Sequence, residues 1–193
     1  MGLNQYNASP ASQRGALMIE VLVAIVIGVI GLWGLMEMQL RLEKSEMESY
    51  QRTQAVIMLN DISNSMQTNR ANASSYVTTA ASPTGTGVTN CGPGSTPTIQ
   101  QSDTADWCNA LQGTAETLSS ASVGSMIGGR GCVETIVLNE QYMVTVAWQG
   151  FTPISAPPTS VACGKDLYDI PSANCINDLC RRYATTMVRI APL

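Results

Sequence analysis

The feature that most constrains this chain is an apolar run near its N-terminus, residues 16–36, in which Glu20 is the only charged residue. A helix of that length is about 31 Å long, which is close to the thickness of the hydrocarbon core of a bilayer. The run is also longer than the apolar part of a secretory signal, which has about 7–15 residues. The sequence therefore predicts a transmembrane helix over residues 16–36.

The residues on either side of the run indicate its orientation. Arg14 is the only charged side chain before the run, and together with the terminal amine it favours a cytoplasmic N-terminus. All six cysteines lie beyond the run, between Cys91 and Cys180, where an oxidising compartment allows them to pair. We therefore expect a single-pass protein with its C-terminal part outside the cytoplasm.

The composition argues against several classes of function. Charged residues make up 12% of the chain, against about 25% in typical soluble domains. The net charge of −4 does not favour a nucleic-acid partner. The chain has no histidine, so a Ser–His or Cys–His nucleophile is excluded. We therefore expect no enzyme activity, no cofactor and no small-molecule substrate.

Six of the acidic residues of the C-terminal part lie in loop-like sequence without a second motif, and we expect them to be solvated loop acids. These residues are Asp103, Asp106, Glu116, Asp166, Asp169 and Asp178. The segment Gly128-Gly129-Arg130-Gly131 lacks the lysine and the preceding strand of a phosphate-binding loop, so we interpret it as a turn.

Six cysteines allow fifteen disulfide connectivities, and the sequence alone does not choose between them. Proximity along the chain favours Cys91–Cys108 and Cys175–Cys180, which leaves Cys132–Cys163. Closing a loop of about 15 residues stabilises a fold by roughly 3 kcal/mol in the chain-entropy model. The cysteines are too scattered for a zinc site and no histidine accompanies them, so we expect disulfides and no metal.

The helix is expected to continue well beyond the apolar run. No proline occurs between Ala16 and Pro83, and Ala55, Leu59, Ile62 and Met66 recur at helical spacing. We predict one helix of about 55–60 residues, with an outer amphipathic half over residues 37–78 that ends near residues 72–75. Three glycines within the apolar run form either a small-residue face for close helix packing or a weak segment that extends or bends. They are Gly28, Gly31 and Gly34.

Residues 79–193 are expected to form a small globular head. Residues 80–131 are rich in Ser, Thr, Gly and Pro, with a short helix within 102–118 whose N-cap is Ser102 or Asp103. Residues 142–149 alternate between apolar and polar, which is typical of a strand, and residues 132–138 and 182–191 provide two more. We predict an α+β fold in which an antiparallel sheet of three or four strands packs on the outer half of the helix.

The sequence Gly15-Ala16-Leu17-Met18-Ile19-Glu20, which follows Arg14 and opens the apolar run, resembles the class III signal of type IV prepilins and type II secretion pseudopilins. The resemblance implies that prepilin peptidase removes residues 1–15 by cutting after Gly15 and methylates the new amine of Ala16. It also implies that Glu20 neutralises the N-terminal amine of a neighbouring subunit. Ala16 departs from the family, because most pilins have phenylalanine at this position.

Four further blocks resemble the PilV kind of minor pilin, in the expected order. They are residues 61–70, 128–134, 142–150 and 180–190. The resemblance implies the type IV pilin fold, stapled by disulfides. It also implies a minor pilin that primes or enters a type IV pilus and supports pilus biogenesis, twitching motility and adhesion.

The implied partners are other minor and major pilins, which contact the N-terminal helix, together with prepilin peptidase and the inner membrane. The implied location is the inner membrane, with a periplasmic head, and then the extracellular fibre. Two alternatives remain open: a minor pseudopilin of a type II secretion system, and a tip adhesin or DNA-uptake module. The long head with three potential disulfides argues against the first, and the scarcity of Lys and Arg argues against the second.

Overall fold

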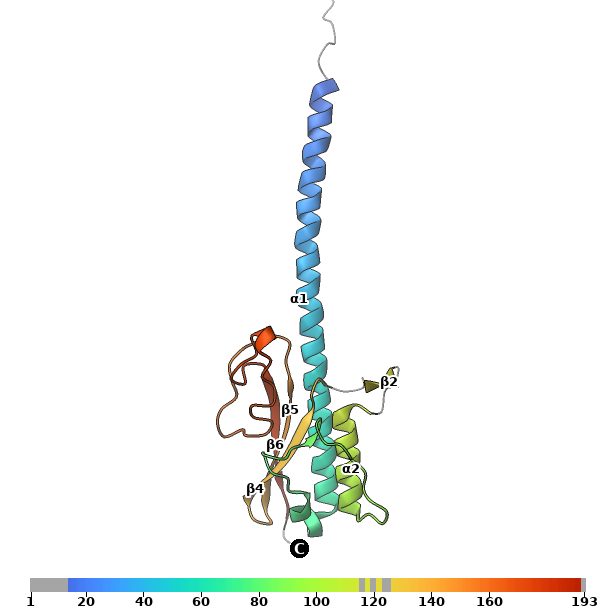
Figure 1. Cartoon of the computed structure of the whole chain (residues 1–193), viewed down its shortest axis with the longest axis vertical. Helices are drawn as coiled ribbons and strands as arrows, with labels where there is room; N and C mark the ends of the chain where they lie inside the picture. The colour runs from blue at the N-terminus through green and yellow to red at the C-terminus, as the bar shows by residue number, and fades with distance from the viewer. Residues whose placement is uncertain (1–13, 115–116, 119–120, 123–125, 192–193) are drawn as a thin grey trace, which may run out of the picture. The chain divides into compact units, whose positions relative to one another are not determined.

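The computed structural model describes residues 14–114, 117–118, 121–122 and 126–191 (Figure 1). The chain divides into two compact units, Met1–Ser45 and Glu46–Leu193. The expected leader, residues 1–15, lies outside the described residues except for Arg14 and Gly15. In chain order the elements are α1 (Arg14–Thr68), η1 (Arg70–Tyr76), β1 (Thr84–Gly85), α2 (Ile99–Gln112), β2 (Thr117–Leu118), β3 (Ala121–Ser122), β4 (Arg130–Val137), β5 (Gln141–Gln149), η2 (Pro171–Ala173) and β6 (Arg181–Arg189).

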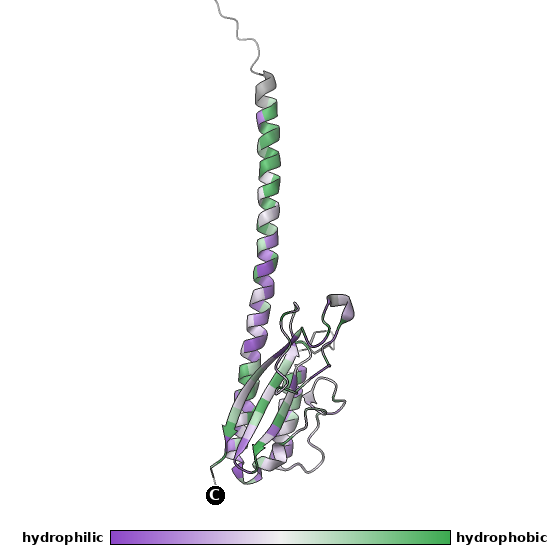
Figure 2. Ribbon diagram, turned by 90° about the vertical axis from the view of Figure 1, so that its left-hand side faces the viewer, coloured by the Kyte–Doolittle hydropathy of each residue, from purple (hydrophilic) through white to green (hydrophobic). Residues whose placement is uncertain are grey.

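Helix α1 has 55 residues and contains no proline. Figure 2 shows a hydrophobic N-terminal stretch of α1 followed by a hydrophilic one. In the second unit the predicted stripe is confirmed, because Ala55, Leu59, Ile62 and Met66 are all buried in the core. Burying a side chain of the size of Leu, Ile or Met contributes about 1.5–3 kcal/mol, so the stripe fixes this part of α1 to the head.

The α-helix ends at Thr68, and the 3-10 helix η1 follows it. The expected outer half, residues 37–78, is therefore α-helical only as far as Thr68. Side-chain hydrogen bonds compete with the helix here: the Thr68 hydroxyl donates to the Asn64 carbonyl, and the Asn72 amide donates to the Asn69 side chain at 2.9 Å. Asn72 has non-helical backbone angles, which turn the chain towards the sheet.

The main sheet has four antiparallel strands in the order β1-β4-β5-β6, which confirms the predicted small antiparallel sheet. Strands β4 and β5 form a hairpin with Asn139 at positive φ in its turn. One face of β5 joins the α1 core through Tyr142, Val144, Val146 and Trp148. The sequence alternates as predicted, yet Thr145 and Ala147 on the opposite face are also buried. The chain around Cys163 covers them, because the Cys163 sulfur lies 3.9 Å from the Thr145 carbonyl oxygen.

Helix α2 begins earlier than the sequence predicts. Its N-cap is Thr98, not Ser102 or Asp103. The Thr98 hydroxyl accepts from the Gln101 N–H at 3.2 Å, and the Gln101 side chain accepts from the Thr98 N–H at 2.9 Å. This reciprocal capping box satisfies two N–H groups that the first turn leaves free, which explains why the helix starts there.

Candidate functional site

The residues of the expected processing motif lie at the start of α1. Gly15 and Ala16 are in its first turns, and Glu20 follows as an exposed residue of the same helix. No hydrogen bond or ion pair reaches the Glu20 carboxylate from the residues that the structure describes. The chain therefore presents an unpaired acid on an apolar helix.

The apolar surface that surrounds Glu20 is uncovered. All residues from 18 to 36 are exposed, and the most apolar window of α1 has a mean hydropathy of 2.5 with none of it buried. This helix near the N-terminus is long and apolar enough to cross a membrane. Such a surface is stable only where lipid or other protein removes it from water.

The three glycines of this segment are open in the isolated chain. A Cβ atom added at Gly28, Gly31 or Gly34 meets no atom within 4 Å. Each glycine costs about 1 kcal/mol in a helix relative to alanine, and no contact with the described residues offsets this cost. Both sequence interpretations of these glycines, close packing against another helix and local weakening, are compatible with this surface.

The head is cross-linked by three disulfides: Cys91–Cys108, Cys132–Cys163 and Cys175–Cys180, with Cα–Cα distances of 5.5, 5.8 and 5.2 Å. These are the pairs that proximity along the chain favours. The first ties the loop after β1 to α2, and the second ties β4 to the long loop between β5 and β6. The third closes the turn that leads into β6. In the described part of the chain, no group of three or more Cys, Asp or Glu side chains has an arrangement that could hold a metal ion.

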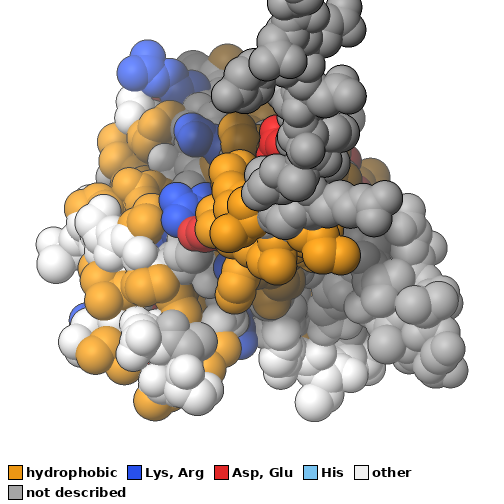
Figure 3. Space-filling view, turned by 90° about the horizontal axis from the view of Figure 1, so that it is seen from above, with side chains coloured by type: hydrophobic (Ala, Val, Ile, Leu, Met, Phe, Trp, Pro, Cys, Tyr) orange, Lys and Arg blue, Asp and Glu red, His pale blue; other side chains and the backbone are white. Residues whose placement is uncertain are grey.

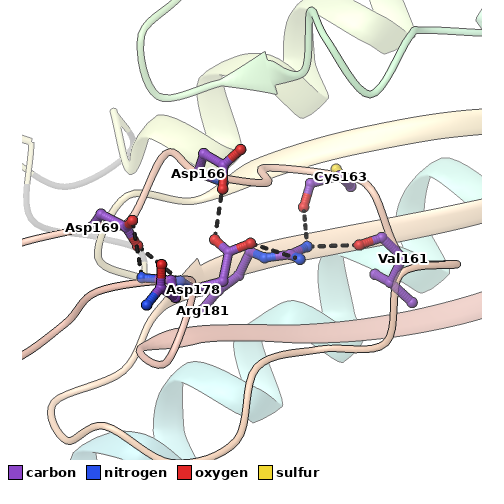
Figure 4. Close-up of polar contacts among 7 residues, drawn as sticks. Val161, Cys163, Asp166, Asp169, Asp178 and Arg181 are labelled. Atoms are coloured by element: carbon purple, nitrogen blue, oxygen red, sulfur yellow. Dashed lines mark hydrogen bonds and ion pairs between the residues drawn. The ribbon is translucent and has the colours of Figure 1, made fainter.

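A buried ion pair organises the loop between β5 and β6 (Figure 4). Arg181 is 3% exposed, and its Nη2 atom lies 3.1 Å from Oδ2 of Asp178, which is also buried. The Arg181 Nη1 atom donates to the carbonyl oxygens of Val161 and Cys163 at 2.8 and 2.9 Å. Asp178 also accepts from the Asp166 N–H at 2.9 Å. One guanidinium therefore joins the start of β6 to Val161 and Cys163, which lie 20 and 18 residues away along the chain.

The turn inside this loop is fixed by a second carboxylate. Asp169 accepts from the N–H groups of Asn177 and Asp178 at 3.1 and 2.9 Å. Asn177 and Asp178 both have positive φ, a conformation that Asn and Asp adopt more readily than most residues. The expectation that the acids of the head are solvated loop acids is therefore wrong for Asp178, which is buried because Arg181 compensates its charge.

The other acids of that set have varied surroundings. Asp103 and Asp106 lie in α2 rather than in a loop, and the Tyr76 hydroxyl donates a hydrogen bond to Asp103. Burial, together with this bond to Asp103, raises the pKa of Tyr76 to about 12. Asp166 and Asp169 are exposed loop residues, and Glu116 lies outside the described residues.

The segment 128–131 is a turn only at its start: Gly128 lies in the turn before β4, whereas Arg130 and Gly131 are already residues of β4. The segment also holds an aromatic ring. The Tyr168 hydroxyl donates to the Gly128 carbonyl at 2.8 Å, and the Arg130 guanidinium lies 4.9 Å from the centroid of the Tyr168 ring. Gly128 and Gly164, both at positive φ, allow this ring to lie against the backbone. The sequence contains no signal for this contact, since Tyr168 is 40 residues from Gly128.

The surface of the head carries few charges. In Figure 3 apolar and uncharged polar side chains make up most of the surface that is not grey, and Lys and Arg appear as separate spots on the face shown. The adjacent Arg181 and Arg182 have separate partners, as expected for neighbours on a strand. Arg182 lies 3.4 Å from Glu48 of α1 and donates to the Thr152 carbonyl at 2.6 Å.

Comparisons with known proteins do not place the chain in a family. No family model, curated protein or solved structure matches it.

Proposed function

We propose that this chain is a minor pilin, a structural subunit that primes or enters a type IV pilus. The observation that carries the proposal is the uncovered apolar helix that begins at the processing motif and presents Glu20 as its unpaired acid. Prepilin peptidase cuts after Gly15 and methylates Ala16, so that the new amine lies four residues before the glutamate. The apolar helix is kept and serves first as an inner-membrane anchor and then as the contact with other pilins.

The physical role of Glu20 follows from the cost of placing a charge in hydrocarbon. An isolated carboxylate at the centre of a span costs roughly 2.5–3.5 kcal/mol on insertion scales, and less near an end. In an assembly of helices the amine of one subunit and Glu20 of its neighbour offset each other's desolvation. Removing one partner leaves the other uncompensated, which costs roughly 3–5 kcal/mol.

The head supports the same role. Three disulfides and a buried ion pair hold its loops in place. Disulfides persist in oxidising compartments, so the head is periplasmic before assembly and extracellular in the fibre. Its function is to occupy a place at the surface or the tip of the pilus.

The test is the Glu20→Ala variant, compared with Glu43→Ala, which removes an exposed acid of the same helix beyond the apolar run. Glu20→Ala is expected to insert in the membrane, lose its leader and form its disulfides normally. Its co-purification with the other pilus subunits, at equal protein levels, is expected to fall, whereas Glu43→Ala is expected to behave as wild type. Wild-type incorporation of Glu20→Ala would show that the carboxylate is merely tolerated near the headgroups.

A further inference from the structure

The two edges of the main sheet differ in length and protection. Strand β1, at one edge, has only two residues, and the Gln112 side chain donates to the Gly85 carbonyl at 3.0 Å. Strand β6, at the other edge, has nine residues that pair with β5 along their whole length without a bulge. Proteins normally keep edge strands short or covered, because an open edge pairs with other chains.

The free side of β6 has no partner within the described part of the chain. No hydrogen bond from outside the sheet reaches residues 183–189 there. Figure 2 shows β6 at the border of the sheet, leading to the C-terminus. A row of main-chain donors and acceptors is therefore left for another strand.

The composition of β6 lacks the features that block pairing. Residues 183–188, Tyr-Ala-Thr-Thr-Met-Val, include no charge, proline or glycine. Val188 faces the core, whereas Tyr183 and Met187, on the opposite face, are 37% and 49% exposed. An added strand would extend both the hydrogen-bond ladder and this exposed face.

The charges at the ends of β6 indicate what kind of strand fits. Arg189 is exposed and forms no ion pair with any described residue, whereas Arg181 and Arg182 at the other end are paired with Asp178 and Glu48. A second copy paired antiparallel through the middle of β6 would bring Arg189 of each copy to the arginine end of the other. Arg181 is already paired with Asp178, so a second copy offers Arg189 no free carboxylate, whereas a strand with a carboxylate opposite Arg189 would complement it. The edge therefore favours a different chain.

We propose that the free edge of β6 binds an extended segment of a partner protein as an added antiparallel strand, uncharged in its middle and with a carboxylate opposite Arg189. The antiparallel direction continues the pattern of the sheet and gives the stronger hydrogen bonds. This proposal goes beyond the role in a pilus and does not depend on it.

The probe is a synthetic peptide matched in length to β6, with alternating threonine and valine and a glutamate placed opposite Arg189. It is added to the full chain in detergent micelles, and backbone amide signals are followed by NMR. We expect saturable shifts confined to β6 and its neighbour β5. The same peptide with alternate amides N-methylated should not bind, and replacing its glutamate by lysine should weaken binding several-fold.

Two proline variants of the protein itself test the free edge of β6. Successive residues of a strand direct their N–H groups to opposite sides, so one of Thr185 and Thr186 has its N–H at the free edge. Proline is tolerated there and disrupts the fold at the other position. One of Thr185→Pro and Thr186→Pro should therefore keep the wild-type melting temperature and lose peptide binding.

Three results would overturn the proposal. The first is the absence of peptide binding, and the second is binding that survives N-methylation or shifts signals away from β6. The third is self-association of the full chain through β6 that the peptide does not displace, because a second copy would then occupy the edge.

Discussion

At the scale of single residues, three ion pairs differ in how far water reaches them. The Arg181 and Asp178 side chains are 3% and 7% exposed, those of Arg182 and Glu48 are 12% and 36% exposed, and those of Arg41 and Glu37 are 78% and 65% exposed. Water screens an exposed pair, whereas a buried charge that loses its partner keeps its full desolvation cost. Loss of one partner is therefore expected to cost most at the buried Arg181–Asp178 pair and least at the exposed Arg41–Glu37 pair.

Replacing Asp178 by Asn removes the negative charge but keeps an oxygen for the Asp166 N–H. Arg181 is then buried without compensation, and we expect the free energy of unfolding to fall by about 3–5 kcal/mol. Glu37→Gln, the matched control, should change it by less than about 0.5 kcal/mol. Chemical denaturation of the full chain, followed by tryptophan fluorescence, measures both values. If both substitutions lowered the free energy of unfolding equally, burial would not determine the cost of losing an ion-pair partner.

Tyr168 gives the head a stability that depends on pH. Burial raises the pKa of Tyr168 to about 12, although the nearby Arg130 opposes the shift. Because the folded protein favours the neutral phenol, this contribution is complete below pH 10, where the unfolded side chain begins to ionise, and is lost as the pH rises towards 12.

Tyr168→Phe removes the hydrogen bond to the Gly128 carbonyl, so we expect a loss of about 1 kcal/mol at pH 7. Between pH 10 and 11.5 the variant should lose stability less steeply than the wild type, because it has one fewer group to ionise. Denaturation curves recorded across this range provide the comparison. Parallel pH profiles for the two proteins would be inconsistent with a raised Tyr168 pKa.

At the scale of elements, the parts that follow from local sequence were predicted and the parts that depend on distant partners were not. Alternation over residues 142–149 identified β5, and the four-residue and three-residue spacings from Ala55 to Met66 identified the buried stripe of α1. The Thr98 cap was missed because Ser, Thr, Gly and Pro dominate its surroundings, although Gln101 three residues later is a recognisable signal. The burial of Asp178 and the contact of Tyr168 with Gly128 could not be read from the sequence, since both depend on how the loop folds back.

The packing of α2 on β4 depends on Gly131, whose role could not be predicted from the sequence either. A Cβ atom added at Gly131 would lie 2.3 Å from the Trp107 ring, and the Trp107 Nε1 donates to the Met58 carbonyl at 3.0 Å. Gly131 thus lets one indole ring contact both β4 and α1. Its role is steric, because its φ is not in the left-handed region.

Gly131→Ala should destabilise the head by about 1–3 kcal/mol through overpacking. In a Trp107→Leu background the same substitution should cost much less, because the ring that it collides with is gone. Thermal unfolding of the four proteins gives the coupling energy of this cycle. An alanine cost that is equal in both backgrounds would mean that the ring is not the obstacle.

At the scale of the whole molecule, the two units differ in whether their apolar surface is buried within the unit. The N-terminal unit presents an apolar helix that none of the described residues covers, and the C-terminal unit has its own core and disulfides. The apolar helix was predictable, because its length and hydropathy are local properties. What packs on it was not, because no described residue pairs with Glu20 or contacts Gly28, Gly31 and Gly34.

We propose that the chain is a prepilin whose apolar helix is kept after processing. Mass spectrometry of the mature protein, isolated from membranes or fibres, tests it most directly. We predict a chain that begins at Ala16 with a methylated amine, and a Gly15→Leu variant that keeps its leader. An intact leader on the wild-type protein, or an N-terminus beyond Met36, would contradict the account.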